Sequence, residues 1–214
     1  TLSLHDALPI YRILSTKNGK LQDVTDFCYL GSWVASSRRD FQSRRYLGFG
    51  ALKKLTRLWK SNCSIDVKMR MFRACVLTVM LYGCESWSLT STLEARLNVA
   101  LTKMLRRVLN LPYVQHITNR QLYERCSIGK MSDIVKQRRL QFAGHCYRLR
   151  QENFYHPVCE MVLSKSSAKF RIGQGRTQTY LKTIQNDTSL DLSALRTLAN
   201  DKNEWRSFVH SVCD

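Results

Sequence analysis

Hydrophobic positions along the chain recur mainly at three- and four-residue spacing, which is the period of an amphipathic α-helix. The first such stretch covers residues 38–60, and its opposite face carries Lys and Arg. The second covers residues 65–87, and because its run from Ala74 to Cys84 carries no charge on any side we expect this part to be buried on most sides. Further helical patterns cover residues 91–109, 118–126 and 132–149.

Cap signals mark the starts of several of these helices. Ser64 is placed to cap the helix over residues 65–87. Near the C-terminus, short helices are expected in the stretches TYLKTIQND, LDLSALRTLAN and DKNEWRSFVHSV. Gly48 and Gly50 weaken the first helical pattern, because glycine costs about 1 kcal/mol against alanine in a helix interior. Capping boxes are expected at Ser91 with Glu94, Thr118 with Gln121, and Asp201 with Glu204.

One short stretch has the composition of a β-strand. Residues Phe27–Val34 are rich in aromatic and β-branched side chains and stand just before the first helical pattern. A lone strand is marginal in isolation, so we expect its partner upstream. The fold class predicted from these patterns is mainly α, with one short β-strand or hairpin near the N-terminus.

The charge of the chain points to a polyanionic partner. Its formal net charge is +18 and its pI is about 9.9, which favours nucleic acid first and an acidic membrane surface or acidic protein after it. Residues 38–73 hold eleven Lys or Arg against Asp40 and Asp66, an asymmetry that favours a binding face. In this stretch Tyr46, Phe49 and Trp59 are expected to lie in the core.

Candidate nucleic-acid contacts are the Arg and Lys side chains of the basic helical stretches, which can bind phosphate oxygens, while Arg can also stack on bases. These are Arg38, Arg39, Arg44, Arg45, Lys53, Lys54, Arg57, Lys60, Arg106, Arg107, Arg138, Arg139, Arg148 and Arg176.

The eight cysteines are scattered and form no C-x-x-C, so we expect reduced thiols in an intracellular protein. His156 and Cys159 are one pair at ligand spacing, with Cys126, His145 and Cys146 upstream, which is too few regular pairs to predict a zinc site.

The ends of the chain and its apolar runs give no membrane or export signal. The most apolar run, Ala74–Cys84, is far shorter than the roughly 20 residues that span a bilayer. Residues Thr1–Ile10 lack the features of a secretory signal. They resemble one translated frame of a common sequencing-library adapter, so they are left out of the fold prediction, and we expect the true upstream sequence to be missing.

The sequence offers no self-sufficient active site. It has no Asp-Asp pair and no D-x-D to hold magnesium, no nucleophile motif and no phosphate-cradling glycine loop. The late acidic residues Asp187, Asp191, Asp201 and Glu204 are expected to cap helix starts.

Five segments occur in an order that resembles one family: FCYLGSWV, RRYLGFGALKKLTRLW, IDVKMRMFRACVLTVMLYGCESW, LRRVLN and RRLQFAGHCYRL. The chain resembles the C-terminal part of the polyprotein of non-LTR (LINE-type) retrotransposons, from about Asp23 to Trp205. The resemblance implies a thumb-like helical bundle and a C-terminal extension that hold template RNA and the nascent duplex. It also implies that the polymerase palm, with its magnesium motif, and the endonuclease lie upstream of this chain.

The resemblance carries over to particular positions. Gly48 and Thr177 depart from it, since alanine and proline are usual there. Tyr29, Leu30, Gly31 and Ser32 match the primer-grip strand, and Arg44 or Arg45, Ala51, Leu55 and Trp59 match the first thumb helix. Tyr82, Gly83, Glu85 and Trp87 match a packing helix, and Arg139, Leu140, Gly144, His145 and Arg148 match the extension.

Together these observations predict a fragment of a reverse transcriptase that binds RNA and DNA and contributes no chemistry. We expect this fragment to need no cofactor and no membrane. The family resemblance implies that it acts in the nucleus. The alternatives are an autonomous helical RNA- or DNA-binding module and a non-functional pseudogene product. The expected organisation is a scar (1–10), the end of the palm with the primer grip (11–37), a thumb-like domain (38–115), an extension (116–163), a basic linker (164–176) and short helices (177–214).

Overall fold

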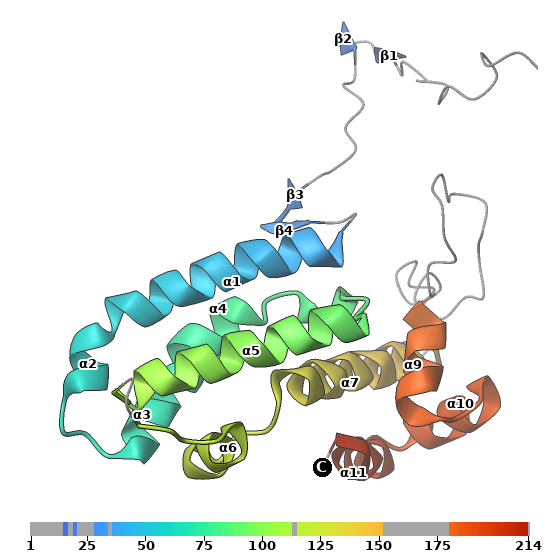
Figure 1. The fold of residues 1–214 in the computed structure, drawn as a ribbon. Coiled ribbons are helices and arrows are strands. Elements are labelled where there is room, and N and C mark those ends of the chain that lie inside the picture. The colour runs from blue at the N-terminus through green and yellow to red at the C-terminus, as the bar shows by residue number, and fades with distance from the viewer. Residues whose placement is uncertain are drawn as a thin grey trace, which may run out of the picture.

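The structure is a computed structural model that describes residues 15–16, 19–20, 28–33, 36–112, 115–151 and 180–213. These residues are mainly α-helical, as the sequence predicts (Figure 1). No helix among them is long and apolar enough to cross a bilayer. The adapter-like residues 1–10, the linker 164–176, Arg176 and Thr177 lie outside this part of the chain, as do His156 and Cys159.

The short β-structure of the described residues consists of two antiparallel hairpins. β1 (Ser15–Thr16) pairs with β2 (Gly19–Lys20), and β3 (Cys28–Tyr29) pairs with β4 (Ser32–Trp33). The continuous strand expected over Phe27–Val34 is therefore wrong, whereas the hairpin alternative is confirmed. The chain reverses because Leu30 and Gly31 both have positive φ, at 47° and 79°, as a two-residue hairpin turn requires.

The first helical stretch is two helices, α1 (Ser37–Lys54) and α2 (Thr56–Lys60), which part at Leu55. Gly48 does not interrupt α1. A Cβ at this position would come within 3.2 Å of Met104 Cε and 3.3 Å of Met80 Sδ, a close contact that these flexible side chains would have to relieve. Trp59 on α2 turns back and donates an indole hydrogen bond to Leu52 O at 2.8 Å, which fastens α2 to the end of α1.

The second stretch is helical only as far as Met80. It runs as α3 (Ile65–Met71), a π-helical segment η2 (Phe72–Leu77) and α4 (Thr78–Met80), with Ser64 accepting a hydrogen bond from Val67 N as the expected cap. The predicted continuation to Trp87 is wrong because Gly83, at φ 71°, reverses the chain before the 3₁₀ turn η3 (Cys84–Ser86).

The next helices follow the predicted pattern closely. They are α5 (Ser91–Val108), α6 (Asn119–Cys126) and α7 (Met131–Gln151). The cap of α5 is Thr90 rather than Ser91, because the Thr90 hydroxyl accepts the hydrogen bond from Leu93 N. The capping box of α6 is confirmed, with Thr118 and Gln121 satisfying each other's backbone N–H.

The three C-terminal helices are α9 (Tyr180–Thr188), α10 (Leu192–Asn200) and α11 (Lys202–Cys213), as predicted. Asp191 caps α10 by accepting from Ala194 N, and Asp201 caps α11 by accepting from Asn203 N and Glu204 N. The prediction that Asp187 caps a helix start is wrong, since it lies inside α9 and pairs with Arg139 at 2.8 Å.

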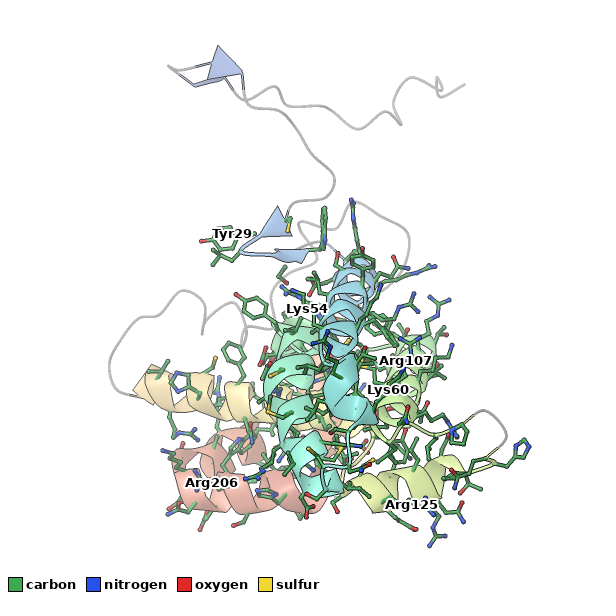
Figure 2. All side chains as sticks on the ribbon, turned by 90° about the vertical axis from the view of Figure 1, so that its left-hand side faces the viewer. Tyr29, Lys54, Lys60, Arg107, Arg125 and Arg206 are labelled. Carbon is green, nitrogen blue, oxygen red and sulfur yellow. The ribbon has the colours of Figure 1, made fainter. Side chains whose placement is uncertain are left out.

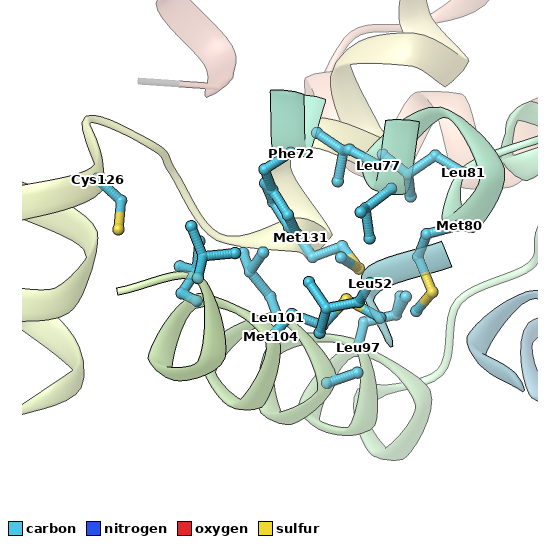
Figure 3. Close-up of a cluster of buried hydrophobic side chains, with 14 of the residues drawn as sticks. Leu52, Phe72, Leu77, Met80, Leu81, Leu97, Leu101, Met104, Cys126 and Met131 are labelled. Atoms are coloured by element: carbon cyan, nitrogen blue, oxygen red, sulfur yellow. The ribbon is translucent and has the colours of Figure 1, made fainter. Parts of the chain in front are cut away.

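The first hydrophobic core lies between α1, α5 and the helical run α3–η2–α4. In Figure 1, α1 and α5 run side by side, and the polypeptide returns between them through α3 to α4. Figure 3 shows the centre of this core, where leucine, methionine and phenylalanine side chains of these helices meet Met131 at the start of α7. Phe72, Val76, Met80, Leu97, Leu101 and Met104 are inaccessible to solvent here.

A second, smaller core lies between the later part of α7 and the three C-terminal helices. Its centre is Trp205, whose indole donates to Leu140 O at 2.9 Å across the backbone of Gly144. A Cβ at Gly144 would lie 2.2 Å from the indole nitrogen, so only glycine allows this approach. Because α7 also gives Met131 and Val135 to the first core, one helix belongs to both.

Candidate nucleic-acid interface

A groove runs between α1–α2 and the C-terminal end of α5. It consists of a hollow of about 940 Å³ and an adjoining one of about 350 Å³, and both are lined by Arg106, Arg107 and Leu111. α1 and α2 contribute Arg45, Lys53 and Lys60, and α5 also contributes Lys103.

Cations gather here because the helical period places them on facing surfaces. On α5, Lys103, Arg106 and Arg107 lie three and four residues apart, and therefore share a face. Figure 2 shows Lys60 and Arg107 next to each other where α2 meets α5, and Arg125 and Arg206 apart from them on α6 and α11.

Among the described residues, no carboxylate lines either hollow, so these residues do not neutralise the cations of the groove from within it. Arg106 is half-buried and donates to Ile117 O at 2.7 Å and to Asn119 Oδ1 at 3.3 Å. This holds the segment after α5 against the helix and forms one wall. Lys53, Lys60, Lys103 and Arg107 are exposed, which leaves them able to bind an anion.

Aromatic side chains stand among these cations. Tyr46 is 80% exposed at the mouth of the larger hollow, so the expectation that it lies in the core is wrong. Phe49 is half-buried beside it, with the Arg107 guanidinium 5.3 Å from its ring centroid. Trp59, in contrast, is 3% exposed, as expected.

The predicted contacts divide by their place in the fold. Arg45, Lys53, Lys60, Arg106 and Arg107 line the groove. Of the remaining residues predicted on α1 and α2, Lys54 and Arg57 are exposed beside it, and Arg38 and Arg39 are exposed at the far end of α1. Arg138 and Arg148 on α7 are half-buried and donate to Leu81 O and Ala199 O.

Arg44 is 7% exposed and belongs to a buried polar cluster centred on Asp40. The Asp40 carboxylate accepts hydrogen bonds from Ser32 Oγ at 3.0 Å, Trp33 N at 3.1 Å and Trp87 Nε1 at 2.7 Å. The cluster therefore joins the β3–β4 hairpin, α1 and the segment after η3. We name these side chains, Ser32, Asp40, Arg44 and Trp87 with the backbone of Trp33, the Asp40 cluster.

The guanidinium of Arg44 is held within this cluster, although its buried Nε has no hydrogen-bond partner among the described residues. It donates to Gly31 O at 2.5 Å, lies over the Tyr82 ring with its carbon 4.3 Å from the centroid, and stands 3.9 Å from Asp40. Its predicted role as a phosphate contact conflicts with this burial, so Arg44 is left out of the interface.

Arg139 is similarly enclosed, at 2% exposure. Its Nε donates to Asp187 Oδ2 at 2.8 Å and its terminal nitrogen to Trp87 O at 2.8 Å. Burial raises the pKa of the Asp187 carboxyl, and the adjacent guanidinium opposes that rise. Arg139 therefore ties α7 to α9 and to the Asp40 cluster, and it too is left out of the interface.

The primer-grip-like residues form the exposed tip of the β3–β4 hairpin. Tyr29 and Leu30 are 60% and 73% exposed, and Figure 2 shows Tyr29 standing away from the helices. Gly31 is also exposed, although its carbonyl oxygen accepts from Arg44, and Ser32 is half-buried and donates to Asp40.

Lys103 and the neighbouring His116 line the groove but were not among the predicted contacts. The signal for Lys103 was its spacing of four residues from Arg107 on a helix already predicted. His116 had no such signal, because it stands between helices, where no period fixes its direction.

The described residues show no metal site, and two of their buried cysteine thiols are unreactive. Among the described residues, no three His, Cys, Asp or Glu side chains come together as ligands. Burial raises the pKa of the Cys84 thiol to about 12 and that of Cys126 to about 11, so both stay protonated and unreactive at neutral pH.

Comparison with known proteins gives one informative similarity. The chain is 25% identical over 154 residues to an uncharacterised transposon-derived protein of Caenorhabditis elegans. The match covers 68% of this chain and 54% of that protein, so the chain spans about half the length of the curated relative. No protein-family model matches the chain, and no solved structure matches it.

Proposed function

We propose that this chain is a C-terminal piece of a non-LTR retrotransposon reverse transcriptase and that its task is to hold nucleic acid. The observation that carries the proposal is the groove between α1–α2 and α5, to which the described residues contribute six cationic side chains and no carboxylate. The similarity to a transposon-derived protein supports a mobile-element origin. The ordered motifs, from the β3–β4 hairpin through α7, resemble the part of the polymerase that follows the palm.

The groove suits a phosphate backbone better than a small anion. Its cations come from two helices and extend over two adjoining hollows, so several phosphates can be neutralised at once. Each phosphate contact releases condensed counterions, which makes the affinity fall steeply with salt.

Polymerisation itself is assigned to a palm outside this chain. Among the described residues, no three His, Cys, Asp or Glu side chains come together. In this proposal the chain positions template RNA and primer or target DNA in the nucleus, and the absent palm supplies the metal and the chemistry.

The test is binding of the full 214-residue chain to labelled RNA and DNA, followed by fluorescence anisotropy from 50 to 200 mM salt. We expect affinity to fall about 10³-fold over this range if six or more phosphates are contacted. Changing Lys53, Lys60, Lys103 and Arg107 together to Ala should lower the slope of log affinity against log salt by about 3, at about 0.7–0.9 for each contact.

The matched control removes the same charge elsewhere. Arg125, Lys130, Lys202 and Arg206 are exposed and lie outside the groove, so changing these four to Ala should leave the salt slope close to that of the parent chain. An equal loss in both variants would mean that charge alone, without a defined groove, accounts for binding. Absence of binding to any polynucleotide would overturn the proposal.

A second candidate, an autonomous nucleic-acid-binding module, is favoured by the β3–β4 hairpin. β3 pairs with β4 and the hairpin is fastened to α1 and Trp87 through Asp40, so neither strand needs an upstream partner. A soluble, cooperatively unfolding 214-residue chain that binds RNA would favour this module. A chain that aggregates unless a palm is supplied would favour the polymerase fragment.

A further inference from the structure

The larger hollow of the groove has features that a phosphate-binding surface does not need. We infer that it is a pocket for an unpaired nucleobase, so that the groove takes single-stranded RNA or DNA in preference to a duplex. This inference rests on the proposed nucleic-acid binding and adds the class of strand.

The first observation is the exposed ring of Tyr46. A tyrosine that is 80% exposed on a helix loses the burial that normally stabilises an aromatic side chain. Here the ring lies at a hollow that Arg45 and Arg106 also line. In such a setting an aromatic ring is a platform on which a base can stack.

The second observation is the composition of the hollow. Its volume of about 940 Å³ lies in the range of about 300–1,000 Å³ typical of small-molecule sites. Phe49, Leu111 and Pro112 give it an apolar part, and Gln115, His116 and Thr118 give it polar groups that can meet a base edge. A surface that only tracked phosphates would need the cations alone.

The third observation is the order of the two hollows. The smaller one, of about 350 Å³, continues past Arg106 and Arg107 to Lys53 and Lys60. A strand with one base in the larger hollow can therefore lay its next phosphates along these cations. In a duplex the base faces are covered by their neighbours, so only an unpaired base can stack on Tyr46.

The experiment compares four 12-nucleotide probes on the full chain by anisotropy: single-stranded RNA and DNA, and the duplex of each. We expect both single strands to bind more tightly than their duplexes. Changing Tyr46 to Leu should weaken single-strand binding about tenfold, because stacking contributes roughly 1–3 kcal/mol per base. Duplex binding should change much less, and Tyr46→Phe should keep the single-strand affinity.

A single strand carrying an abasic position at each third nucleotide separates base from backbone. It should bind more weakly to the parent chain than the intact strand and should be less sensitive to Tyr46→Leu. Both results support the pocket.

The contrary outcomes are distinct. Equal affinity for single strands and duplexes, with no effect of Tyr46→Leu, overturns the base pocket and leaves the proposed nucleic-acid binding in place. Binding of a poly-glutamate peptide as tightly as RNA overturns both, since it would show a surface that reads charge only.

Discussion

Arginine side chains have different roles in two regions of this molecule, since one is exposed to solvent and the other is buried and paired. In the groove, Arg107 is exposed among other cations beside the Phe49 ring, and no carboxylate of the described residues lines the groove there. In the Asp40 cluster, Arg44 is enclosed by a carbonyl, a carboxylate and an aromatic ring. In the groove the charge of Arg107 is available to a partner, whereas in the Asp40 cluster the charge of Arg44 is paired within the fold.

The count of basic residues therefore overstates the number of cations that are exposed to a binding partner. A buried charge must be paired, and its removal leaves the partner unsatisfied, so such residues control stability. An exposed cation without a partner contributes little to folding, so its loss is felt only when a ligand is present. Stability and binding measurements should therefore separate the two regions cleanly.

The largest expected loss of stability is that caused by Asp40→Ala. The change leaves Trp87 Nε1 and Trp33 N without their acceptor and removes the carboxylate that stands 3.9 Å from the buried Arg44 guanidinium, so we expect a loss of about 3–5 kcal/mol in unfolding free energy. Urea denaturation followed by circular dichroism measures it. Lys53→Ala in the groove should change stability by less than about 0.5 kcal/mol while weakening RNA binding.

Asp66→Ala serves as the charge-matched control for Asp40, because Asp66 is an exposed acid in the first turn of α3. Its loss should cost at most about 1 kcal/mol through the helix dipole. Equal destabilisation by both changes would show that net charge, rather than the buried cluster, is responsible.

The second-largest expected loss of stability is that of Gly144→Ala, which tests the packing of the second core. The new methyl group would lie against the Trp205 indole, so the docking of α11 must give way at a cost of about 1–3 kcal/mol. The red shift of tryptophan emission and the unfolding midpoint report it. Gly50→Ala is the matched control, since nothing lies near its Cβ and the helix should gain about 1 kcal/mol.

A smaller effect is expected for Gly48→Ala, the residue usual in the resembling family. The methyl group would approach Met80 and Met104, whose flexible side chains can yield by a few tenths of an ångström. The gain in helix propensity then gives a net stabilisation of roughly 0–1 kcal/mol. Chemical denaturation decides the sign, and a clear destabilisation would show that the methionines cannot move.

The smallest effect is the acid sensitivity of the C-terminal helices. Hydrogen bonds from Ala194 N to Asp191 and from Glu204 N to Asp201 lower the pKa of both carboxyls. Their stabilisation is therefore present above the unfolded pKa near 3.9 and is lost as pH falls through the lower native values.

Thermal melts at pH 5, 4 and 3 measure this loss. Asp191→Asn with Asp201→Asn keeps a capping acceptor but removes the titration, so the double variant should melt with a weaker pH dependence over this window. An unchanged dependence would assign the acid sensitivity to other carboxyls.

Local chemistry was enough to predict most of the helices. The cap at Ser64 and the box at Thr118 and Gln121 are satisfied within a few residues, so the sequence alone identifies them. The break at Leu55 and the π-helical segment Phe72–Leu77 were not predicted, because tertiary packing around an unbroken hydrophobic pattern decides them.

Five of the predicted contacts line the groove, whereas Arg44 and Arg139 are buried elsewhere. The i,i+4 spacing of Asp40 and Arg44 could have flagged a paired arginine. Arg139 gave no such warning, because its partner Asp187 is 48 residues away. Tyr46 was assigned to the core since spacing says which residues share a face, but not which face a partner helix covers.

The single helix that serves both cores sets their relative orientation. α7 is a 21-residue rod about 30 Å long, with Val135 in the first core and Leu140 in the second. Each residue inserted between these positions would rotate everything beyond it by roughly 100° and advance it about 1.5 Å. The spacing from Val135 to Leu140 therefore fixes the angle between the two cores: a one-residue insertion there would carry the C-terminal helices around the helix axis and move Asp187 away from Trp87, so that Arg139 could no longer reach both of its acceptors.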